Sequence, residues 1–278
     1  MLQQSPNNSS FHHHGRDNDL LQQQSNKYRK INDQLSSVLS EYQDLRPPNI
    51  VVIGEQSAGK SSVLEYLSGI RFVTGQNMVT KCPLQLRMVN SKSSSGSKAV
   101  IKSNIYLTKH SNKPITIENP EINDGAQQLE EAIQHLTSLH LQEEGYTGDV
   151  SRVSTHLIEV EITSPNVPDL TLIDLPGLIT TSNEKNPTLK DDIRQLVKRN
   201  TTDRDCILIV GDAGRDLQTI VGFEEAREKD PSQKRTLCAL TRVDKHVNDI
   251  ETLNKMIESL NNRGPIKLVH GYVGLRNR

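Results

Sequence analysis

Short apolar runs alternate with amphipathic segments from residue 49 towards the end of the chain. Apolar runs bounded by turn residues are typical of buried strands, and apolar residues three and four apart are typical of helices. The expected strands cover residues 49–53, 84–89, 156–163, 170–174, 205–210 and 235–240, and residues 267–269 begin another. The expected helices cover residues 61–68, 127–141, 189–199, 222–229 and 250–260. This alternation predicts an α/β fold, with a mostly parallel central sheet and helices on both of its faces.

Two segments refine this expectation. Residues 156–163 alternate between apolar and polar, as a strand with one exposed face does, so the sheet has room for an antiparallel member. Residues 90–98 contain five serines and show no hydrophobic periodicity, which predicts a surface loop.

The first 46 residues follow other patterns. Residues 1–16 are rich in Gln, Asn, Ser and His without periodicity, so we expect a disordered arm, and we interpret its histidine run as a polar tail or tag remnant. The pattern of residues 17–46 predicts a helix. Pro47 and Pro48 end this helix, and the main domain covers residues 47–278. Two interpretations of its apolar stripe stay open, packing on that domain or packing with partner helices in a bundle. The stripe consists of Tyr28, Ile31, Leu35, Val38, Tyr42 and Leu45.

Composition narrows the function classes. The 33 Lys and Arg residues nearly balance the 34 Asp and Glu residues, so no overall basic charge favours nucleic acid, and we expect no such partner. No apolar run reaches the roughly 18 residues needed to cross a bilayer, and residues 1–16 lack a secretory signal, so we expect a cytoplasmic protein. Cys82, Cys206 and Cys238 form no C-x-x-C pair, which argues against a disulfide framework or a zinc site. We expect Cys206 and Cys238 to be core residues of their strands.

Residues 54–61 read G-E-Q-S-A-G-K-S between an expected strand and an expected helix. In that context the pattern G-x-x-x-x-G-K-[ST] predicts a phosphate-binding loop, so the fold class becomes that of a P-loop nucleotide hydrolase. Glycines let successive N–H groups point at the phosphates, and the helix N-terminus adds its positive dipole end. We expect the Lys60 ammonium on the β- and γ-phosphates and the Ser61 hydroxyl on Mg²⁺.

Residues 174–177, D-L-P-G, follow another expected strand. Ligands of open parallel sheets lie beyond the carboxyl ends of the strands. We therefore expect Asp174 to hold Mg²⁺ through water and the Gly177 amide to contact the γ-phosphate.

Residues 241–244, T-R-V-D, end the expected strand 235–240. A carboxylate there accepts both the ring N–H and the exocyclic amine of guanine, whereas adenine presents an acceptor instead of the ring N–H. Leaving a buried carboxylate unpaired costs roughly 1 to 3 kcal/mol or more. Asp244 therefore favours GTP and GDP over adenine nucleotides.

Four strings together resemble the GTPase domain of dynamin-type large GTPases, including their Mx-like branch. They are residues 54–62, 79–84, 168–177 and 230–236, and the resemblance extends from about residue 17 to the last residue. It identifies residues 17–46 with the first helix of the family's bundle signalling element. It also implies that the chain is C-terminally truncated, because residue 278 lies within the family's base-binding loop.

The resemblance implies further site residues. Gln56, Ser57 and Thr80 would position the attacking water, and Thr80 would also bind Mg²⁺. A monovalent cation would lie between Ser57 and the first switch. Gly271 and Tyr272, with Asn277 and Arg278, would begin the loop around the guanine. We expect Thr241, Arg242 and Asp244 to contact the nucleotide, together with the whole phosphate loop. Its residues are Glu55, Gln56, Ser57, Ala58, Gly59, Lys60, Ser61 and Ser62.

The resemblance also implies partners and a process. A homodimer through the GTPase domain, a peripheral place at membranes or microtubules, and membrane remodelling or fission all belong to the family. The sequence departs from the family at four positions: Arg242 replaces lysine, Asn77 a glycine, and Val221 and Val247 replace carboxylates that reach across the dimer. These departures keep an alternative open, a catalytically weak GTP-binding module that acts through a partner. A P-loop ATPase or nucleotide kinase is a third interpretation.

Overall fold

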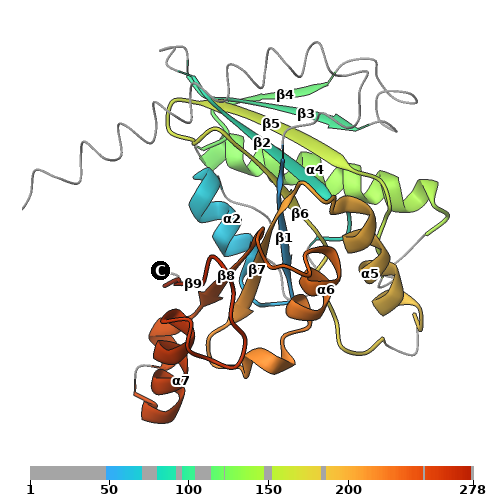
Figure 1. Cartoon of the computed structure of the whole chain (residues 1–278). Helices are drawn as coiled ribbons and strands as arrows, with labels where there is room; N and C mark the ends of the chain where they lie inside the picture. The colour runs from blue at the N-terminus through green and yellow to red at the C-terminus, as the bar shows by residue number, and fades with distance from the viewer. Residues whose placement is uncertain are drawn as a thin grey trace, which may run out of the picture. The chain divides into compact units, whose positions relative to one another are not determined.

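The strands that the computed structural model describes form one sheet (Figure 1). The structure describes residues 48–70, 80–91, 96–103, 114–121, 123–146, 152–182, 186–246 and 248–276. Within these residues the sheet has nine strands in the order β4-β3-β5-β2-β6-β1-β7-β8-β9. The predicted arm at 1–16, the predicted helix at 17–46, Asn77, Val247, Asn277 and Arg278 lie outside them.

Six of the predicted strands are confirmed to within two residues at each end. The described strands are β1 Ile50–Gly54, β2 Leu84–Asn90, β3 Lys98–Ser103, β4 Ile115–Glu118, β5 Ile158–Ser164, β6 Leu170–Asp174, β7 Cys206–Asp212, β8 Thr236–Thr241 and β9 Tyr272–Gly274. The prediction missed β3 and β4, and it was wrong about residues 267–269, which precede β9 and form no strand. Cys238 is buried as expected, but Cys206 is exposed, at the first residue of β7, where pairing with β8 has not yet begun.

The five helices predicted after residue 60 are present. They are α2 Lys60–Ser68, α4 Asn123–Glu143, α5 Leu189–Asn200, α6 Val221–Lys229 and α7 Ile250–Leu260, and the 3-10 helices η2 Leu217–Thr219 and η3 Val243–His246 lie between them. No helix in the described part of the chain combines the length and the apolar character that crossing a membrane requires.

Five neighbouring strands, β6, β1, β7, β8 and β9, run parallel to one another. Beyond β6 the direction changes, because β2 pairs antiparallel with β6 and parallel with β5. The expected antiparallel member is therefore confirmed in β5, whose residues alternate between buried and more exposed positions. The parallel half of the sheet brings the carboxyl ends of β6, β1, β7 and β8 to one edge, where open α/β sheets bind their ligands.

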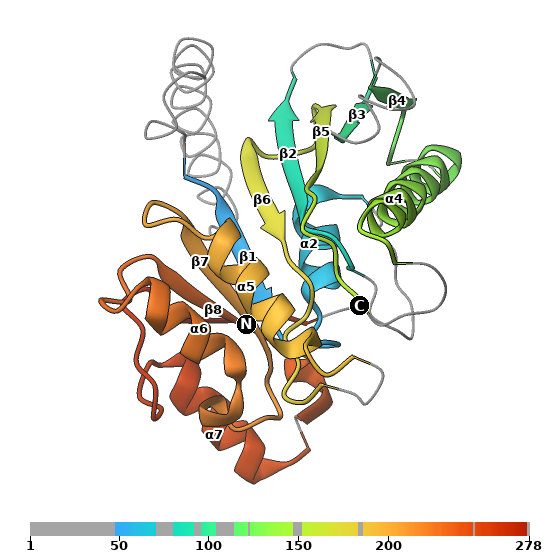
Figure 2. The same ribbon diagram turned by 90° about the vertical axis from the view of Figure 1, so that its right-hand side faces the viewer.

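Two apolar cores lie on opposite faces of the sheet. Successive residues of β1 contribute to the two cores in turn: Val52 belongs to one core, and Val51 and Ile53 belong to the other. The first core includes residues of α2 and α4, and the second includes residues of α5, α6 and α7. Figure 2 shows α4 on one side of the sheet and α5 and α6 on the other. Helices on both faces are therefore confirmed.

Buried carboxylates hold together the amino ends of the parallel strands. Asp205 accepts the backbone N–H of Asn49 at 2.9 Å, which joins the turn before β7 to the start of β1. Asp230 accepts the Arg235 N–H and the Thr236 hydroxyl at 2.8 Å each, and the Arg235 guanidinium donates to the carbonyl of Asp205. Asp205 and the string at residues 230–236 thus secure the amino ends of β1, β7 and β8 together.

A buried histidine couples β3 to α4. The Nε2 of His140 lies 2.6 Å from the Ser103 hydroxyl, and the ring has no exposed surface. Burial, together with the charge of nearby His156, lowers the pKa of His140 from 6.5 to about 4. Between about pH 4 and pH 6.5, His140 therefore binds a proton in the unfolded chain but not in the folded chain.

We expect acid to destabilise the protein through His140. The stability is fully present above about pH 6.5 and falls as the pH approaches 4, because only the unfolded state binds the proton in that window. Between pH 7 and pH 5 the free energy of unfolding should drop by about 2 kcal/mol through this group. Urea unfolding at both pH values checks this, and His140→Gln should remove that difference. His135→Gln, on the exposed side of the same helix, should keep it.

Candidate nucleotide-binding site

The loop between β1 and α2 curls tightly at the carboxyl edge of the sheet. Gly59 caps α2 at φ 95°, and Ser57 takes φ 64°, both in the left-handed region. Gly54 has no room for a side chain, since a Cβ there would lie 2.4 Å from the carbonyl oxygen of Val210. Gln56 and Ser57 are exposed, so the tip of the loop faces the outside.

The segment after β6 lies directly against this loop. The Gln56 N–H donates to the carbonyl of Leu178 at 3.0 Å, and the Leu178 N–H donates to the carbonyl of Gly54 at 2.9 Å. A Cβ on Gly177 would lie 2.8 Å from the Cα of Gln56 and 3.1 Å from the Nζ of Lys60. The structure therefore brings together the two motifs at residues 54–61 and 174–177, and only glycine fits at 177.

Lys60 and Asp174 are buried beneath the loop with opposite charges, 8% and 4% exposed. Lys60 donates a long hydrogen bond of 3.5 Å to the carbonyl of Gly54. Burial lowers the pKa of Lys60 and raises that of Asp174, and the attraction between the two charges opposes both shifts. Each charged form is thus stabilised only partly, and an anion beside Lys60 or a cation beside Asp174 would complete its environment.

Thr80 lies beside Asp174, as expected for two ligands of one ion. Its hydroxyl donates to Oδ2 of Asp174 at 2.9 Å, while Oδ1 is buried without a hydrogen-bond partner in the described residues. Ser61, the third expected ligand, is half-buried in the first turn of α2. Hydroxyl and carboxylate oxygens are the hard donors that Mg²⁺ prefers, so the residues present fit this ion.

Thr241 supports the loop from behind. The side chain has no exposed surface, and its hydroxyl lies 2.7 Å from the carbonyl of Ala58 and 3.2 Å from that of Gly211. Its methyl carbon lies 3.2 Å from the position that a Cβ on Gly59 would take. The predicted nucleotide contact of Thr241 stays a prediction; its buried hydroxyl contacts the loop backbone.

Two described segments, one after β8 and one at β9, contain the rest of the expected base pocket. Asp244 is half-buried in η3, two residues after Arg242, whose guanidinium lies against Ser57 and Asp212. Gly271 takes φ 69° before β9, and the Tyr272 hydroxyl donates to the carbonyl of Ile266 at 2.8 Å. Arg242 therefore points towards the phosphate loop, a direction that the motif alone does not specify.

Glu55 turns its carboxylate away from the phosphate side. It forms an ion pair with Arg215 and accepts the backbone N–H of Val221 at 3.3 Å, which joins the loop to the start of α6. Only the backbone of Glu55 is therefore left to contact a nucleotide. The sequence patterns did not predict Arg215 or Asp212 as residues near the site. Asp212 could have been found, because it lies at the carboxyl end of β7, a strand next to β1.

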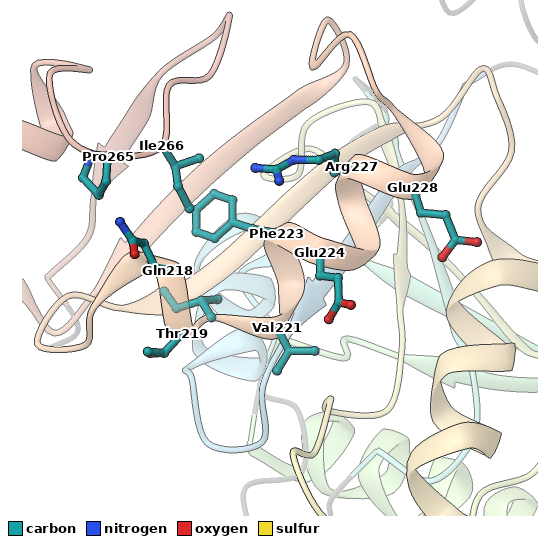
Figure 3. Close-up of a pocket in the computed structure, with 10 residues that line it drawn as sticks. Gln218, Thr219, Val221, Phe223, Glu224, Arg227, Glu228, Pro265 and Ile266 are labelled. Atoms are coloured by element: carbon teal, nitrogen blue, oxygen red, sulfur yellow. The ribbon is translucent and has the colours of Figure 1, made fainter.

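A groove of about 660 Å³ adjoins this connection (Figure 3). Its apolar residues include Val221, Phe223 and Ile266, and charged residues of α6, among them Glu224 and Arg227, lie along it. Val221 thus lines the groove with its side chain and contacts the loop residue Glu55 with its amide.

Comparison with known proteins agrees with this geometry. A family model described as "Dynamin family" matches residues 50–243, from β1 to the start of η3. The chain belongs to the dynamin family. The match includes the phosphate loop, Thr80, Asp174 and Thr241, and it confirms the expected P-loop fold.

Among the relatives of this dynamin-family chain are two interferon-induced GTP-binding proteins. Mx1 of Ictalurus punctatus is 35% identical over 264 residues, which cover 93% of this chain and 39% of the relative. Mx1 of Bos taurus is 34% identical over 247 residues, 87% of this chain and 35% of the relative. The dynamin-family chain therefore spans less than two fifths of the length of these relatives.

We expect the Thr241 hydroxyl to stabilise this dynamin-family loop measurably. Thr241→Val leaves the buried carbonyl of Ala58 without its donor, which should lower the free energy of unfolding by about 1 to 3 kcal/mol. Urea unfolding checks this value. Thr241→Ser keeps the hydroxyl and loses one methyl group, so it should lose only about 0.8 kcal/mol. A Thr241→Val protein no less stable than Thr241→Ser would contradict the role of the hydroxyl.

Proposed function

We propose that this dynamin-family chain binds GTP with Mg²⁺ and hydrolyses it to GDP and phosphate. The observation that carries the proposal is the pair of buried opposite charges, Lys60 and Asp174, at the base of an exposed phosphate loop. Triphosphate and a divalent cation are the two partners that such a pair lacks.

Phosphate binding would rest on the loop backbone and Lys60. The N–H groups at the start of α2 carry the positive end of the helix dipole, and the ammonium of Lys60 is already desolvated. A phosphate oxygen beside Lys60 would favour its charged form, which burial disfavours. In the same way the Gly177 amide, next to Lys60, would contact the γ-phosphate.

Ser61, Thr80 and Asp174 would hold the magnesium ion, which would neutralise charge on the β- and γ-phosphates. The unpartnered Oδ1 of Asp174 supports this assignment, because a buried carboxylate oxygen without a donor costs free energy that a cation or its water would offset.

Hydrolysis would depend on positioning rather than on a base of the protein's own. Gln56 and Ser57 are exposed at the loop tip, where they could orient a water molecule together with Thr80. A monovalent cation near Ser57 belongs to this proposal, and residues 71–79, which would complete its site, lie outside the described residues.

The wider biology rests on family membership alone. We propose a cytoplasmic protein that acts at membranes or microtubules, with a homodimer through the GTPase domain that increases its turnover. Membrane remodelling, the expected process, belongs to the same proposal.

We expect Lys60→Ala to abolish GTP binding and turnover, because it removes the one buried cation beneath the described part of the loop. Binding of a fluorescent GTP analogue and phosphate release in magnesium buffer measure the two steps. Lys255→Ala, an exposed lysine of α7, is the matched control and should behave as wild type. Wild-type turnover in Lys60→Ala would refute the proposed site.

The protein concentration separates the enzyme from the catalytically weak module. Specific turnover that rises with concentration supports the dimerising GTPase. Slow turnover that stays flat supports a binding module, which the departures Val221 and Asn77 favour.

We expect Asp244→Asn to change the preferred base. An amide presents one acceptor and one donor, so it loses its match to the two donors of guanine and gains one to xanthine, which presents a donor and an acceptor. Guanine should lose at least about tenfold in competition against adenine and xanthine nucleotides, which corresponds to roughly 1.4 kcal/mol. Asp203→Asn, an exposed carboxylate in the turn before β7, is the control. An unchanged competition profile would place the base elsewhere.

A further inference from the structure

Asp212 and Arg242 form an ion pair at the carboxyl ends of β7 and β8. The Nη1 of Arg242 lies 2.6 Å from Oδ2 of Asp212, and the two side chains are 33% and 20% exposed. Asp212 pairs with Thr241 in the register of the two strands, so Arg242 follows directly after this rung. The pair therefore lies at the last rung between β7 and β8, where both strands end.

The same guanidinium reaches the phosphate loop. Its Nη2 donates to the carbonyl of Ser57 at 2.8 Å. One planar group thus bridges a strand end and the loop tip, with one nitrogen for each partner. A lysine ammonium is a point charge without this fork, so it would not reproduce two bonds in fixed directions.

Asp212 is itself fixed in one orientation. Its Oδ1 accepts the Gly214 N–H at 2.9 Å and lies 3.7 Å from Nε2 of His246. Gly214 leaves no space there, since a Cβ would come within 2.3 Å of the His246 ring. Burial disfavours the charged form of Asp212, but the Gly214 amide, Arg242 and His246 outweigh it and lower its pKa, so the carboxylate is charged at neutral pH.

Ser57 needs such support more than its neighbours do. It is exposed, and it takes φ 64°, a backbone conformation that a residue with a side chain adopts at a cost. Ala58 is held from behind by Thr241 and by its N–H bond to the carbonyl of Glu55. Arg242 secures the carbonyl at the tip in the same way.

We propose that Asp212 is a positioning residue of the nucleotide site: it orients the Arg242 guanidinium so that Arg242 holds the Ser57 carbonyl and keeps the phosphate loop in its binding shape. This inference rests on the proposed function, since it assigns to Asp212 a part in how long the guanosine nucleotide stays bound. Asp212 touches no nucleotide and acts through Arg242 alone.

The test is a double-mutant cycle on nucleotide dissociation. Asp212→Asn keeps the shape of the side chain and the acceptor for Gly214 but removes the charge that fixes Arg242. It should speed dissociation of a fluorescent GDP about tenfold, as expected for loss of a charged hydrogen bond that is partly exposed. Arg242→Gln should have a similar effect, and the double variant should add less than about twofold.

Two controls separate positioning from general stability. Glu251→Gln also turns an ion-paired carboxylate into an amide, on exposed α7, and should leave dissociation unchanged. Arg242→Lys keeps the charge but not the fork, so it should resemble Arg242→Gln. Amide exchange in the nucleotide-free protein should become faster at residues 56–59 in Asp212→Asn and stay unchanged in Glu251→Gln.

Each outcome decides the question. Dissociation from Asp212→Asn at the wild-type rate overturns the inference, and so do effects of the two single variants that multiply in the double variant. If the wild-type protein binds no guanosine nucleotide, the proposed function fails, and amide exchange still tests Asp212. Unchanged exchange at residues 56–59 would then overturn the positioning role as well.

Discussion

The buried charges of Lys60 and Asp174 are the constraint on which the site depends. Removing either charge from water costs free energy that their mutual attraction offsets only in part. Burial therefore lowers the pKa of Lys60 and raises that of Asp174, which favours the neutral form of each group. The fold accepts this cost at the base of a loop whose tip is exposed. A site built in this way is most stable when an anion and a cation are bound, which links its stability to its ligands.

Separate segments hold the loop in place around these charges. The segment after β6 pairs with Gly54 and Gln56, and the start of α6 binds Glu55 from the other side. From behind, Thr241 contacts the carbonyl of Ala58, while Arg242 contacts that of Ser57. Because the sheet fixes each of these segments independently, the loop needs little support from its own few residues, and left-handed conformations at Ser57 and Gly59 persist.

Local patterns predicted the elements that carry their own signal. The strand β1, the loop and α2 are consecutive, so their hydrophobic run and glycines defined them together, and β6 was placed without error. The strands β3 and β4 were missed because they are short, with at most three consecutive apolar residues, and carry exposed polar residues at their ends. The partners of Glu55 and Arg242 could not be predicted either. Val221 and Ser57 lie 166 and 185 residues from them along the chain, and only the folded sheet brings them together.

The charges around the loop explain why a ligand belongs at one place and not at its neighbours. Arg215 is neutralised by Glu55, and Arg242 by Asp212, each through a direct ion pair. Lys60 has no such contact with Asp174 in the described structure, although the two attract each other. The first two pairs are complete and therefore serve the architecture of the loop. The third is incomplete, and its cation and its carboxylate are each left to a partner of opposite charge, which is the arrangement that a nucleoside triphosphate with its metal ion satisfies.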